Sequence, residues 1–408
     1  MKINGIIAEY NPFHNGHKYL LDTSKAISGA DYTIAIMSGN FVQRGGPALT
    51  DKHTRTEMAL RGGADLILEL PPYYATASAE AFAYGAVSIL NSLGTVDTLS
   101  FGSECGDLGL LTSIASLLVT EPEEYRLLLR SKLNLGMNFP SARATALSEY
   151  LGSDKSFQIL SSPNNILGIE YLKALNRQES NIRPLTITRS DNGYHSEDIK
   201  GEFCSASAIR KALLSSVPLS ELSYALPESS ACLLSSSQNR IAFVSENDFS
   251  EVLYYRLLSE RDRGYEKYTD VSEELSDRIK NKLSAFRDYS SFCDILKTKE
   301  VTYSRISRCL LHIMLDLVDA PSKDIPPAIP YVRVLGFRKE AENLLSAICN
   351  HSSIPVITKL TDAKNSLSDK DYLRFQNDLR ISQFYLGIAA QKRKSVPINE
   401  YTHPMIII

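Results

Sequence analysis

The feature that most constrains the fold is an alternation of short apolar runs with longer amphipathic stretches over about the first 215 residues. The apolar runs have the length of strands and occupy residues 3–8, 32–37, 65–70, 98–101 and 183–188. Between them, residues 18–28 and 78–90 carry apolar side chains at helical spacing. Strands that alternate with helices form right-handed βαβ units. The pattern therefore predicts an α/β fold with a doubly wound parallel sheet.

The sequence pattern changes after residue 210. Serine-rich polar stretches at 214–218 and 235–239 are typical of connections. From about 245 to 320, apolar residues recur three and four positions apart, and a mixed region with apolar runs at 332–335 and 354–358 follows. We therefore divide the chain into an α/β domain at 1–225 and a mostly α-helical region at 226–408.

Composition excludes several classes of protein. In 408 residues, 44 Lys and Arg face 47 Asp and Glu, so the net charge of -3 does not describe a uniformly basic nucleic-acid-binding protein. The two closest of six cysteines, Cys293 and Cys309, lie 16 positions apart (309 − 293), which is not a zinc-finger spacing, and no metal site is predicted. Because the chain shows neither a signal peptide nor about 18 consecutive apolar residues, we expect a cytoplasmic protein without a membrane partner.

The strongest local signal lies where the first predicted strand ends and the first helix begins. His14, Asn15, Gly16 and His17 stand in this loop. In an open α/β sheet, ligands bind at the carboxyl ends of the strands, and a helix N-terminus favours a phosphate. Gly16 lets the backbone approach a bulky anion, and the two histidines would project together toward a triphosphate. The alternative is a pair of surface histidines in a turn.

A second signal follows at residues 205–210. Either Ser205 or Ser207 can cap a helix, and Arg210, one turn further, can donate to phosphate oxygens. Taken alone, the segment also fits an ordinary capped helix with a solvated arginine. Together, the two motifs resemble the HxGH nucleotidyltransferases, a superfamily (HUP, Rossmann-like) that includes phosphopantetheine adenylyltransferase and class I aminoacyl-tRNA synthetases. The resemblance implies attack on the α-phosphorus of ATP, with His14 and His17 as the catalytic residues that stabilise phosphate charge.

More segments narrow the resemblance. The stretches at 9–17, 38–45, 51–55, 101–104, 162–168, 303–306 and 333–337 are similar to the bacterial tRNA(Met) cytidine acetate ligases. That family implies an ATP-dependent ligase that activates acetate as acetyl-adenylate and transfers the acetyl group to N4 of the wobble cytidine of elongator tRNA(Met). The product is N4-acetylcytidine, and acetyl-CoA is not required. Mg2+ is expected with ATP, without assigned protein ligands.

The resemblance also implies the residues of the ATP site, although the choice between Asn164 and Asn165 stays open. The implied residues are Ile7, Ala8, Glu9, Tyr10, Asn11, Pro12, Phe13, His14, Asn15, Gly16, His17, Lys18, Tyr19, Leu20, Gly102, Asn164, Arg189, Ser207 and Arg210. Gly102 follows a predicted strand, where the missing side chain would admit adenosine. Glu9 and Glu104 are candidates for the base that deprotonates N4.

Two further sets of residues are hypotheses about substrates. Lys52 and Arg55 belong to a loop rich in anion ligands, and we expect one of them to hold acetate or pyrophosphate, unless they form a solvated face. For tRNA, the basic segment at 297–312 combines positive charge with an aromatic ring. Its candidate residues are Lys297, Lys299, Tyr303, Arg305 and Arg308. The alternative to RNA binding is that this segment is a solvated helix face.

Two other functions remain open. A small-molecule adenylyltransferase, of the phosphopantetheine or nicotinamide nucleotide type, would share both phosphate motifs but would leave the helical region without a purpose. A non-catalytic ATP-binding RNA assembly factor would not need the histidine pair. No protein partner is evident, and the sequence does not define the oligomeric state or the tRNA features that are recognised.

Overall fold

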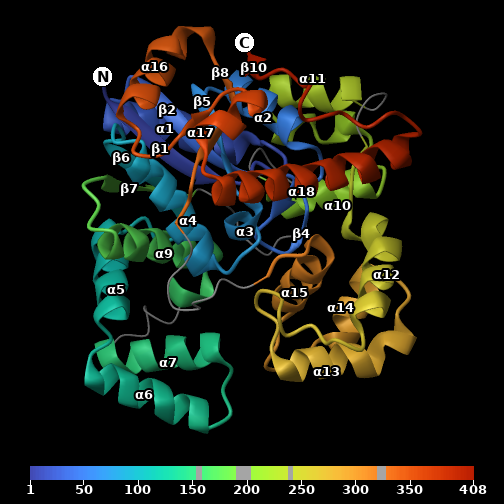
Figure 1. The fold of residues 1–408 in the computed structure, drawn as a ribbon. Helices are drawn as coiled ribbons and strands as arrows, with labels where there is room; N and C mark the ends of the chain where they lie inside the picture. The colour runs from blue at the N-terminus through green and yellow to red at the C-terminus, as the bar shows by residue number, and fades with distance from the viewer. Residues whose placement is uncertain (153–158, 190–203, 238–241, 319–327) are drawn as a thin grey trace.

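A twisted eight-stranded sheet forms the centre of the computed structural model, which describes residues 1–152, 159–189, 204–237, 242–318 and 328–408 (Figure 1). The strands follow the order β10-β8-β5-β2-β1-β6-β7, and β9 pairs with β8. Their bounds are β1 Ile3–Ala8, β2 Tyr32–Ser38, β5 Leu66–Leu70, β6 Thr98–Ser103, β7 Arg183–Thr188, β8 Val332–Phe337, β9 Val356–Ile357 and β10 Ile406–Ile407. Every neighbouring pair is parallel except β5 and β8. The α/β class and its mostly parallel sheet are confirmed.

The strands are apolar on both faces because helices cover both faces. In β2, Ile34 and Ile36 pack in the same cluster as α4 (Ala79–Ser92) and α9 (Pro163–Arg177). The alternate residues Ala35 and Met37 pack instead with α1 (Asn15–Ser28) and α2 (Lys52–Arg61). This two-sided burial is why the strands read as continuous apolar runs in the sequence.

The remaining helices add to both flanks of the sheet and form a separate helical module (Figure 1). Near the sheet lie α3 Pro72–Ala75, α5 Leu108–Thr120, α10 Ala206–Leu214, α11 Glu228–Ser237, α16 Glu342–His351 and α17 Ala363–Ser366. α6 Glu123–Asn134 and α7 Phe139–Leu151 pack against each other farther from the sheet, beyond α5 and α9 (Figure 1). The helical module consists of α12 Ser250–Glu260, α13 Glu273–Lys282, α14 Tyr289–Leu296 and α15 Tyr303–Leu315. Within the described ranges, no helix combines the length and apolar content that crossing a membrane requires.

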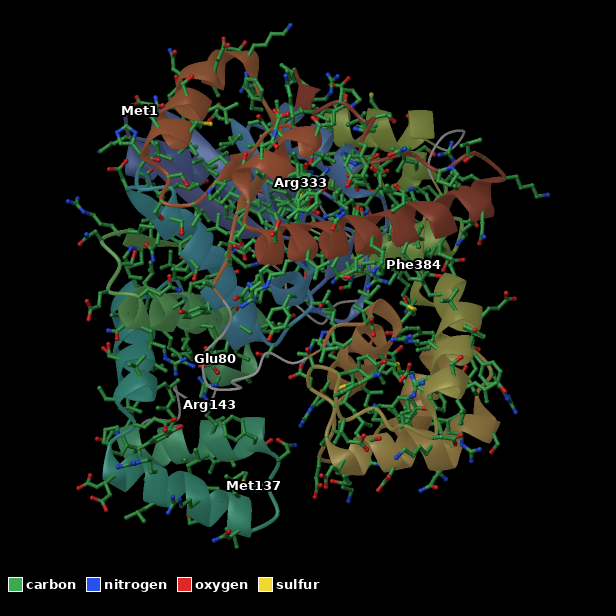
Figure 2. The ribbon with its side chains drawn as sticks, in the orientation of Figure 1. Met1, Glu80, Met137, Arg143, Arg333 and Phe384 are labelled. Carbon is green, nitrogen blue, oxygen red and sulfur yellow. The ribbon has the colours of Figure 1, made fainter. Side chains whose placement is uncertain are left out.

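The long helix α18 (Asp369–Arg393) connects the helical module to the sheet domain. Figure 2 shows Phe384 on the side of α18 that faces the module, where its ring lies 5.3 Å from that of Phe249. The neighbouring Tyr385 is buried in the module's core, and its hydroxyl donates to the carbonyl oxygen of Ala48 at 2.8 Å. One helix therefore contributes to both packing units.

The sheet crosses the predicted division at residue 225. β8, β9 and β10 all come from the 226–408 region, and β8 pairs antiparallel with β5 of the first region. The apolar run at 332–335 is fully buried as part of β8. Strand pairing between segments some 265 residues apart is not a local property, since Leu68 pairs with Val334. The helical module forms only the middle part of the second predicted region.

Four charged side chains are buried where β8 and the C-terminal segment meet the sheet. Lys52 Nζ lies 2.7 Å from Glu69 Oε1 and 3.1 Å from Glu400 Oε1. Arg333 contacts the same two carboxylates at 3.1 and 2.6 Å, and Figure 2 places it between the sheet and α18. Burial by itself would raise the pKa of Glu400, but Lys52 and Arg333 outweigh it and hold that pKa well below its usual range. We call these four residues the buried charge cluster.

The buried charge cluster makes Arg333 a strong test of stability. Arg333→Ala leaves two carboxylates to share one ammonium group in a buried site, so we expect the free energy of unfolding to fall by about 3–5 kcal/mol. Arg338→Ala removes a partly exposed arginine 3.7 Å from Glu340 and should cost about 0–1 kcal/mol. Urea unfolding of both variants measures the difference. Equal losses would mean that the cluster contributes no more than a surface pair.

Candidate active site

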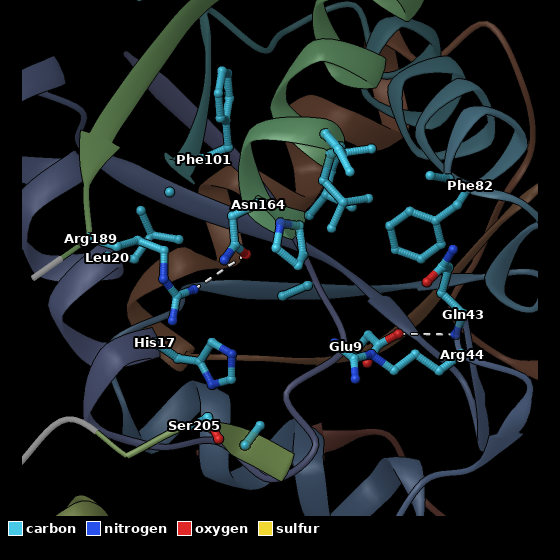
Figure 3. Close-up of a pocket in the computed structure, with 18 of the residues that line it drawn as sticks. Glu9, His17, Leu20, Gln43, Arg44, Phe82, Phe101, Asn164, Arg189 and Ser205 are labelled. Atoms are coloured by element: carbon cyan, nitrogen blue, oxygen red, sulfur yellow. Dashed lines mark hydrogen bonds between the residues drawn. The ribbon is translucent and has the colours of Figure 1, made fainter. Parts of the chain in front are cut away.

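A cavity of about 340 Å³ opens at the carboxyl edge of the sheet, beside β1. β1 is the strand from which the chain order runs outward in both directions, and this reversal is where open α/β sheets bind ligands. The cavity is lined by Ile7, Ala8, Glu9, His14, His17, Leu20, Gln43, Arg44, Ala79, Phe82, Phe101, Gly102, Pro163, Asn164, Ile166, Leu167, Tyr171, Arg189, Ser205, Ala206, Ser207 and Arg210. Figure 3 shows most of them around the opening.

The two motif histidines form the start of α1, three residues earlier than the apolar pattern predicts. His14 is the N-cap, and its Nδ1 accepts a hydrogen bond from the backbone N–H of Gly16 at 3.0 Å. His17 Nδ1 accepts in turn from the backbone N–H of His14 at 3.3 Å, and the ring centres lie 3.8 Å apart. Because each Nδ1 is an acceptor, the proton of each neutral ring is on Nε2. Both histidines therefore carry an Nε2–H donor at the cavity.

Both histidine rings are neutral near pH 7. Burial, together with the positive charges of Arg189 and Arg210, lowers the pKa of His14 to about 3. Burial, His14 and Arg189 likewise hold the pKa of His17 well below its usual value. In the protein without ligand, the positive charge of the site is therefore that of the arginines, and the imidazoles act as uncharged donors.

Two glycines make room for site side chains. A Cβ on Gly16 would lie 2.9 Å from Cε1 of the His14 ring, so glycine here allows that ring to fold over its own helix. A Cβ on Gly102 would lie 3.2 Å from Cγ of Arg189. The space beside Gly102 is thus shared with Arg189. The roles expected from the sequence, close approach of an anion at Gly16 and admission of adenosine at Gly102, stay predictions.

Asn164, rather than Asn165, faces the cavity. Asn164 Nδ2 donates to Glu104 Oε1 at 2.7 Å, and its Oδ1 accepts from Arg189 at 3.4 Å (Figure 3). Asn165 is buried, and its Oδ1 accepts from the backbone N–H groups of Glu104 and Cys105. The carboxylate of Glu104 also accepts from the backbone N–H groups of both asparagines. Glu104 therefore holds the start of α9 in place and is poorly disposed to act as a base.

The second motif meets the first at the same cavity. Ser205 is the N-cap of α10, and its Oγ accepts from the backbone N–H of Ala208. Arg210 Nη1 donates to the carbonyl oxygen of Asn11 at 2.8 Å, across 199 positions of sequence. Ser207 lines the cavity beside them. The fold thus brings together two helix N-termini and two arginines, an arrangement suited to a polyphosphate.

The other residues of the 7–20 segment support the loop from outside the cavity lining. Tyr10, Asn11, Pro12 and Phe13 are buried below it, where Asn11 Oδ1 accepts from the backbone N–H of Leu49 at 2.8 Å. The amide of Asn15 donates to the carbonyl oxygen of Tyr224, Lys18 pairs with Asp22 at 2.9 Å, and Tyr19 is exposed. Ile7, Ala8, Glu9 and Leu20 do line the cavity.

Lys52 and Arg55 do not lie at the cavity. Lys52 belongs to the buried charge cluster, with no exposed side-chain surface. Arg55 is equally buried and donates to the backbone carbonyl oxygens of Glu9 at 2.6 Å, Ser38 at 3.1 Å and Thr50 at 3.1 Å. These bonds hold the loops together, so the predicted contact with acetate or pyrophosphate is not supported. The cationic side chain that this part of the chain does supply to the cavity is Arg44.

Gln43 and Arg44 line one side of the cavity, but neither was predicted as a site residue. Both lie on the turn between β3 (Phe41–Val42) and β4 (Gly46–Pro47) and line the cavity together with Phe82 and Tyr171. The signal for the turn was present, because residues 38–45 follow the carboxyl end of a strand. Nothing local distinguishes the arginine that reaches the cavity from the one that is buried.

The residues expected to bind tRNA divide into two groups. Lys297, Lys299 and Arg305 are exposed around the start of α15. Arg308 is largely covered, with its Nε 3.5 Å from Asp270 Oδ2, and Tyr303 packs against the core of the helical module. An aromatic ring is more accessible on α12, where Tyr255 is 71% exposed.

No metal site is apparent at the cavity. Among the described residues, no three His, Cys, Asp or Glu side chains are grouped so that they could hold a metal ion. The described side chains therefore do not group into a metal site for the Mg2+ expected with ATP.

Comparison with known proteins agrees with this geometry. A family model described as HIGH Nucleotidyl Transferase matches residues 1–398. A tRNA(Met) cytidine acetate ligase of Thermoanaerobacter sp. (strain X514) is 43% identical over 407 residues, which is 100% of both chains. One of Acetivibrio thermocellus is 44% identical over 373 residues, 89% of each chain. The chain therefore belongs to the HIGH nucleotidyl transferase family, within the group of the tRNA(Met) cytidine acetate ligases.

Solved structures show the same fold over the whole chain. The apo crystal structure of Thermotoga maritima TmcAL superposes with a TM-score of 0.92 at 32% identity, covering 100% of both chains. The structure of the same protein bound with alpha-thio ATP superposes with a TM-score of 0.89, also at 32% identity and full coverage. The α/β nucleotidyltransferase fold predicted from the two motifs is confirmed.

The neutral state of the histidines is directly measurable. With the pKa of His14 near 3 and that of His17 also depressed, neither ring should gain a proton as the pH falls from 8 to 5.5. Nitrogen-15 shifts of labelled histidine, assigned with His14→Asn and His17→Asn variants, should stay constant for both rings over this range. Titration of either ring near pH 6.5 in the free protein would contradict the burial argument.

The two asparagines provide a matched pair. Asn164→Ala removes an amide at the cavity, so we expect the KM for ATP to rise about tenfold with little loss of stability. Asn165→Ala leaves two backbone N–H groups without an acceptor, which should lower the free energy of unfolding by about 1–3 kcal/mol for each group. Steady-state kinetics and urea unfolding separate these effects. A larger KM effect from Asn165→Ala would reverse the assignment.

Proposed function

We propose that this protein is an ATP-dependent ligase that forms N4-acetylcytidine at the wobble position of elongator tRNA(Met). The observation that carries the proposal is the convergence of His14, His17, Arg189 and Arg210 at two helix N-termini in one cavity. It occurs in a chain that matches proteins named tRNA(Met) cytidine acetate ligase over its full length. ATP and acetate are the proposed co-substrates.

In the first step, a carboxylate oxygen of acetate attacks the α-phosphorus of ATP. A phosphorus–oxygen bond to acetate forms, the bond to the β-phosphate oxygen breaks, and pyrophosphate leaves with the electron pair. Negative charge therefore grows on the leaving oxygens. The Nε2–H donors of His14 and His17, the two arginines and the N-terminus of α10 stabilise it. We expect Mg2+ to accompany ATP on its phosphate oxygens and assign it no protein ligand.

In the second step, N4 of the cytidine attacks the acetyl carbon of acetyl-adenylate. The bond from N4 to the acetyl carbon forms, the bond from that carbon to the phosphate oxygen breaks, AMP leaves, and N4 loses one proton. N4 is a weak nucleophile because its lone pair is delocalised into the ring. The mixed anhydride supplies the activation that this amine needs.

We propose that the tRNA binds over the helical module. Lys297, Lys299 and Arg305 give an exposed positive surface near the start of α15. Phosphate contacts of this kind position an RNA, and exposed aromatic rings stack on its unpaired bases. Tyr255 replaces Tyr303 as the ring that we would test first for stacking.

The proposal predicts the fate of labelled acetate. With ATP and unmodified tRNA(Met), label should enter the tRNA while pyrophosphate and AMP accumulate. His14→Ala and His17→Ala should each lower kcat about 10²–10³-fold, because each removes a donor to developing phosphate charge. His351→Ala, on the exposed face of α16, should match the wild type.

Three outcomes separate this function from its rivals. Label in the tRNA together with pyrophosphate supports the ligase. Transfer of AMP to a small molecule, with no label in RNA, would indicate an adenylyltransferase. Binding of ATP without release of pyrophosphate would indicate a non-catalytic factor.

A further inference from the structure

We propose that the side of the cavity formed by Glu9, Gln43 and Arg44 is the subsite for the cytosine base that accepts the acetyl group. The inference rests on the proposed function and deepens it, because it specifies where the second substrate lies. Figure 3 shows these residues across the opening from His17, Arg189 and Ser205. If the triphosphate occupies the histidine side, the opposite side is left for another group.

One carboxylate oxygen of Glu9 is open as a hydrogen-bond acceptor. Its Oε1 accepts from the backbone N–H of Gln43 at 2.9 Å, which fixes the carboxylate against the turn (Figure 3). The other oxygen accepts no hydrogen bond from any residue that the structure describes. A carboxylate with one fixed oxygen and one open oxygen at a cavity wall is an acceptor for an amine.

The surrounding groups match a cytosine. Cytosine presents the N4 amine as donor, N3 and O2 as acceptors, and two flat apolar faces. Glu9 would accept from N4, the side chain of Arg44 would donate to O2, and Phe82 and Tyr171 add aromatic surface to the same cavity. Uracil presents O4 where cytosine has its amine, so its oxygen would face the Glu9 carboxylate. Acetate alone, with two acceptor oxygens and a methyl group, does not call for a carboxylate here.

The turn that carries Gln43 and Arg44 is attached to the helical module. The carbonyl oxygen of Gly45 accepts from Ser307 Oγ at 2.8 Å and from the Tyr289 hydroxyl at 3.3 Å. Gly45 has a φ of 86°, and a Cβ on it would lie 2.3 Å from the backbone nitrogen of Arg308. Helix α15, proposed to contact the RNA backbone near its start, is thus in direct contact with the turn that would read the base.

The test compares anticodon stem-loop RNAs that carry C or U at the wobble position. Binding is measured by fluorescence anisotropy without ATP, and acetate-dependent exchange of pyrophosphate into ATP is measured separately. The wild type should bind the C form at least about tenfold more tightly, and Glu9→Gln should bring the ratio close to one, because an amide can donate to O4 as well as accept from N4. Arg44→Ala should weaken both RNAs by a similar factor, since O2 is common to the two bases.

The controls distinguish a failed subsite from a failed function. Glu57→Gln, a matched change on α2 away from the cavity lining, should keep the C preference. An unchanged C preference in Glu9→Gln overturns the inference. A rate of pyrophosphate exchange into ATP that falls as much as the rate of acetyl transfer also overturns it, because this side of the cavity would then bind ATP. Thermal unfolding shows whether each variant is folded. Glu9→Asp is a second variant that retains the negative charge, and it should keep the C preference. If the wild type does not acetylate RNA, the proposed function itself fails.

Discussion

The cavity depends on the buried guanidinium of Arg55. Its donors reach the backbone carbonyl oxygens of Glu9, Ser38, Gly39 and Thr50, which lie where β1 and β2 end and just before α2 begins. Leaving these carbonyl oxygens buried without donors would be costly. One planar group with five N–H donors satisfies them together. The positions of the histidine loop and of the β3–β4 turn both follow from this arrangement.

The C-terminal part of the chain clamps the same loops. Asn40 Nδ2 donates to Ser382 Oγ of α18 at 2.9 Å, and Asn40 Oδ1 accepts from the backbone N–H of Lys52 at 2.7 Å. Lys52 is itself part of the buried charge cluster, and another member of that cluster, Glu400, lies close to the end of the chain. A site built on the first strands is therefore completed by segments more than 300 residues away. This is the physical reason why the sheet extends across the predicted domain division.

Features with a local cause could be predicted from the sequence, and features with a distant cause could not. Strands β1, β2, β5 and β7 and the capped start of α10 follow from runs and spacings within one element. The burial of Lys52 and Arg55 depends on carbonyl oxygens and carboxylates supplied by other elements, so a basic loop was mistaken for a substrate site. The contact between Gly16 and the ring of His14 has no signal in the sequence, because it depends on how that ring folds over the helix. The pairing of β8 with β5 has no sequence signal beyond an apolar run.

The neutral histidines bear on how the site divides binding from catalysis. Burial and the charges of Arg189 and Arg210 lower the pKa of His14 in the free protein, so the histidine pair adds donors without adding charge. Arginines and helix N-termini attract a triphosphate in its ground state and in its transition state alike. Hydrogen bonds from the histidine N–H donors become stronger as charge increases on the oxygens of the departing pyrophosphate. Mutation of the arginines should therefore affect mainly the KM for ATP, whereas mutation of the histidines should affect mainly kcat, which is the division expected for a site that stabilises the transition state.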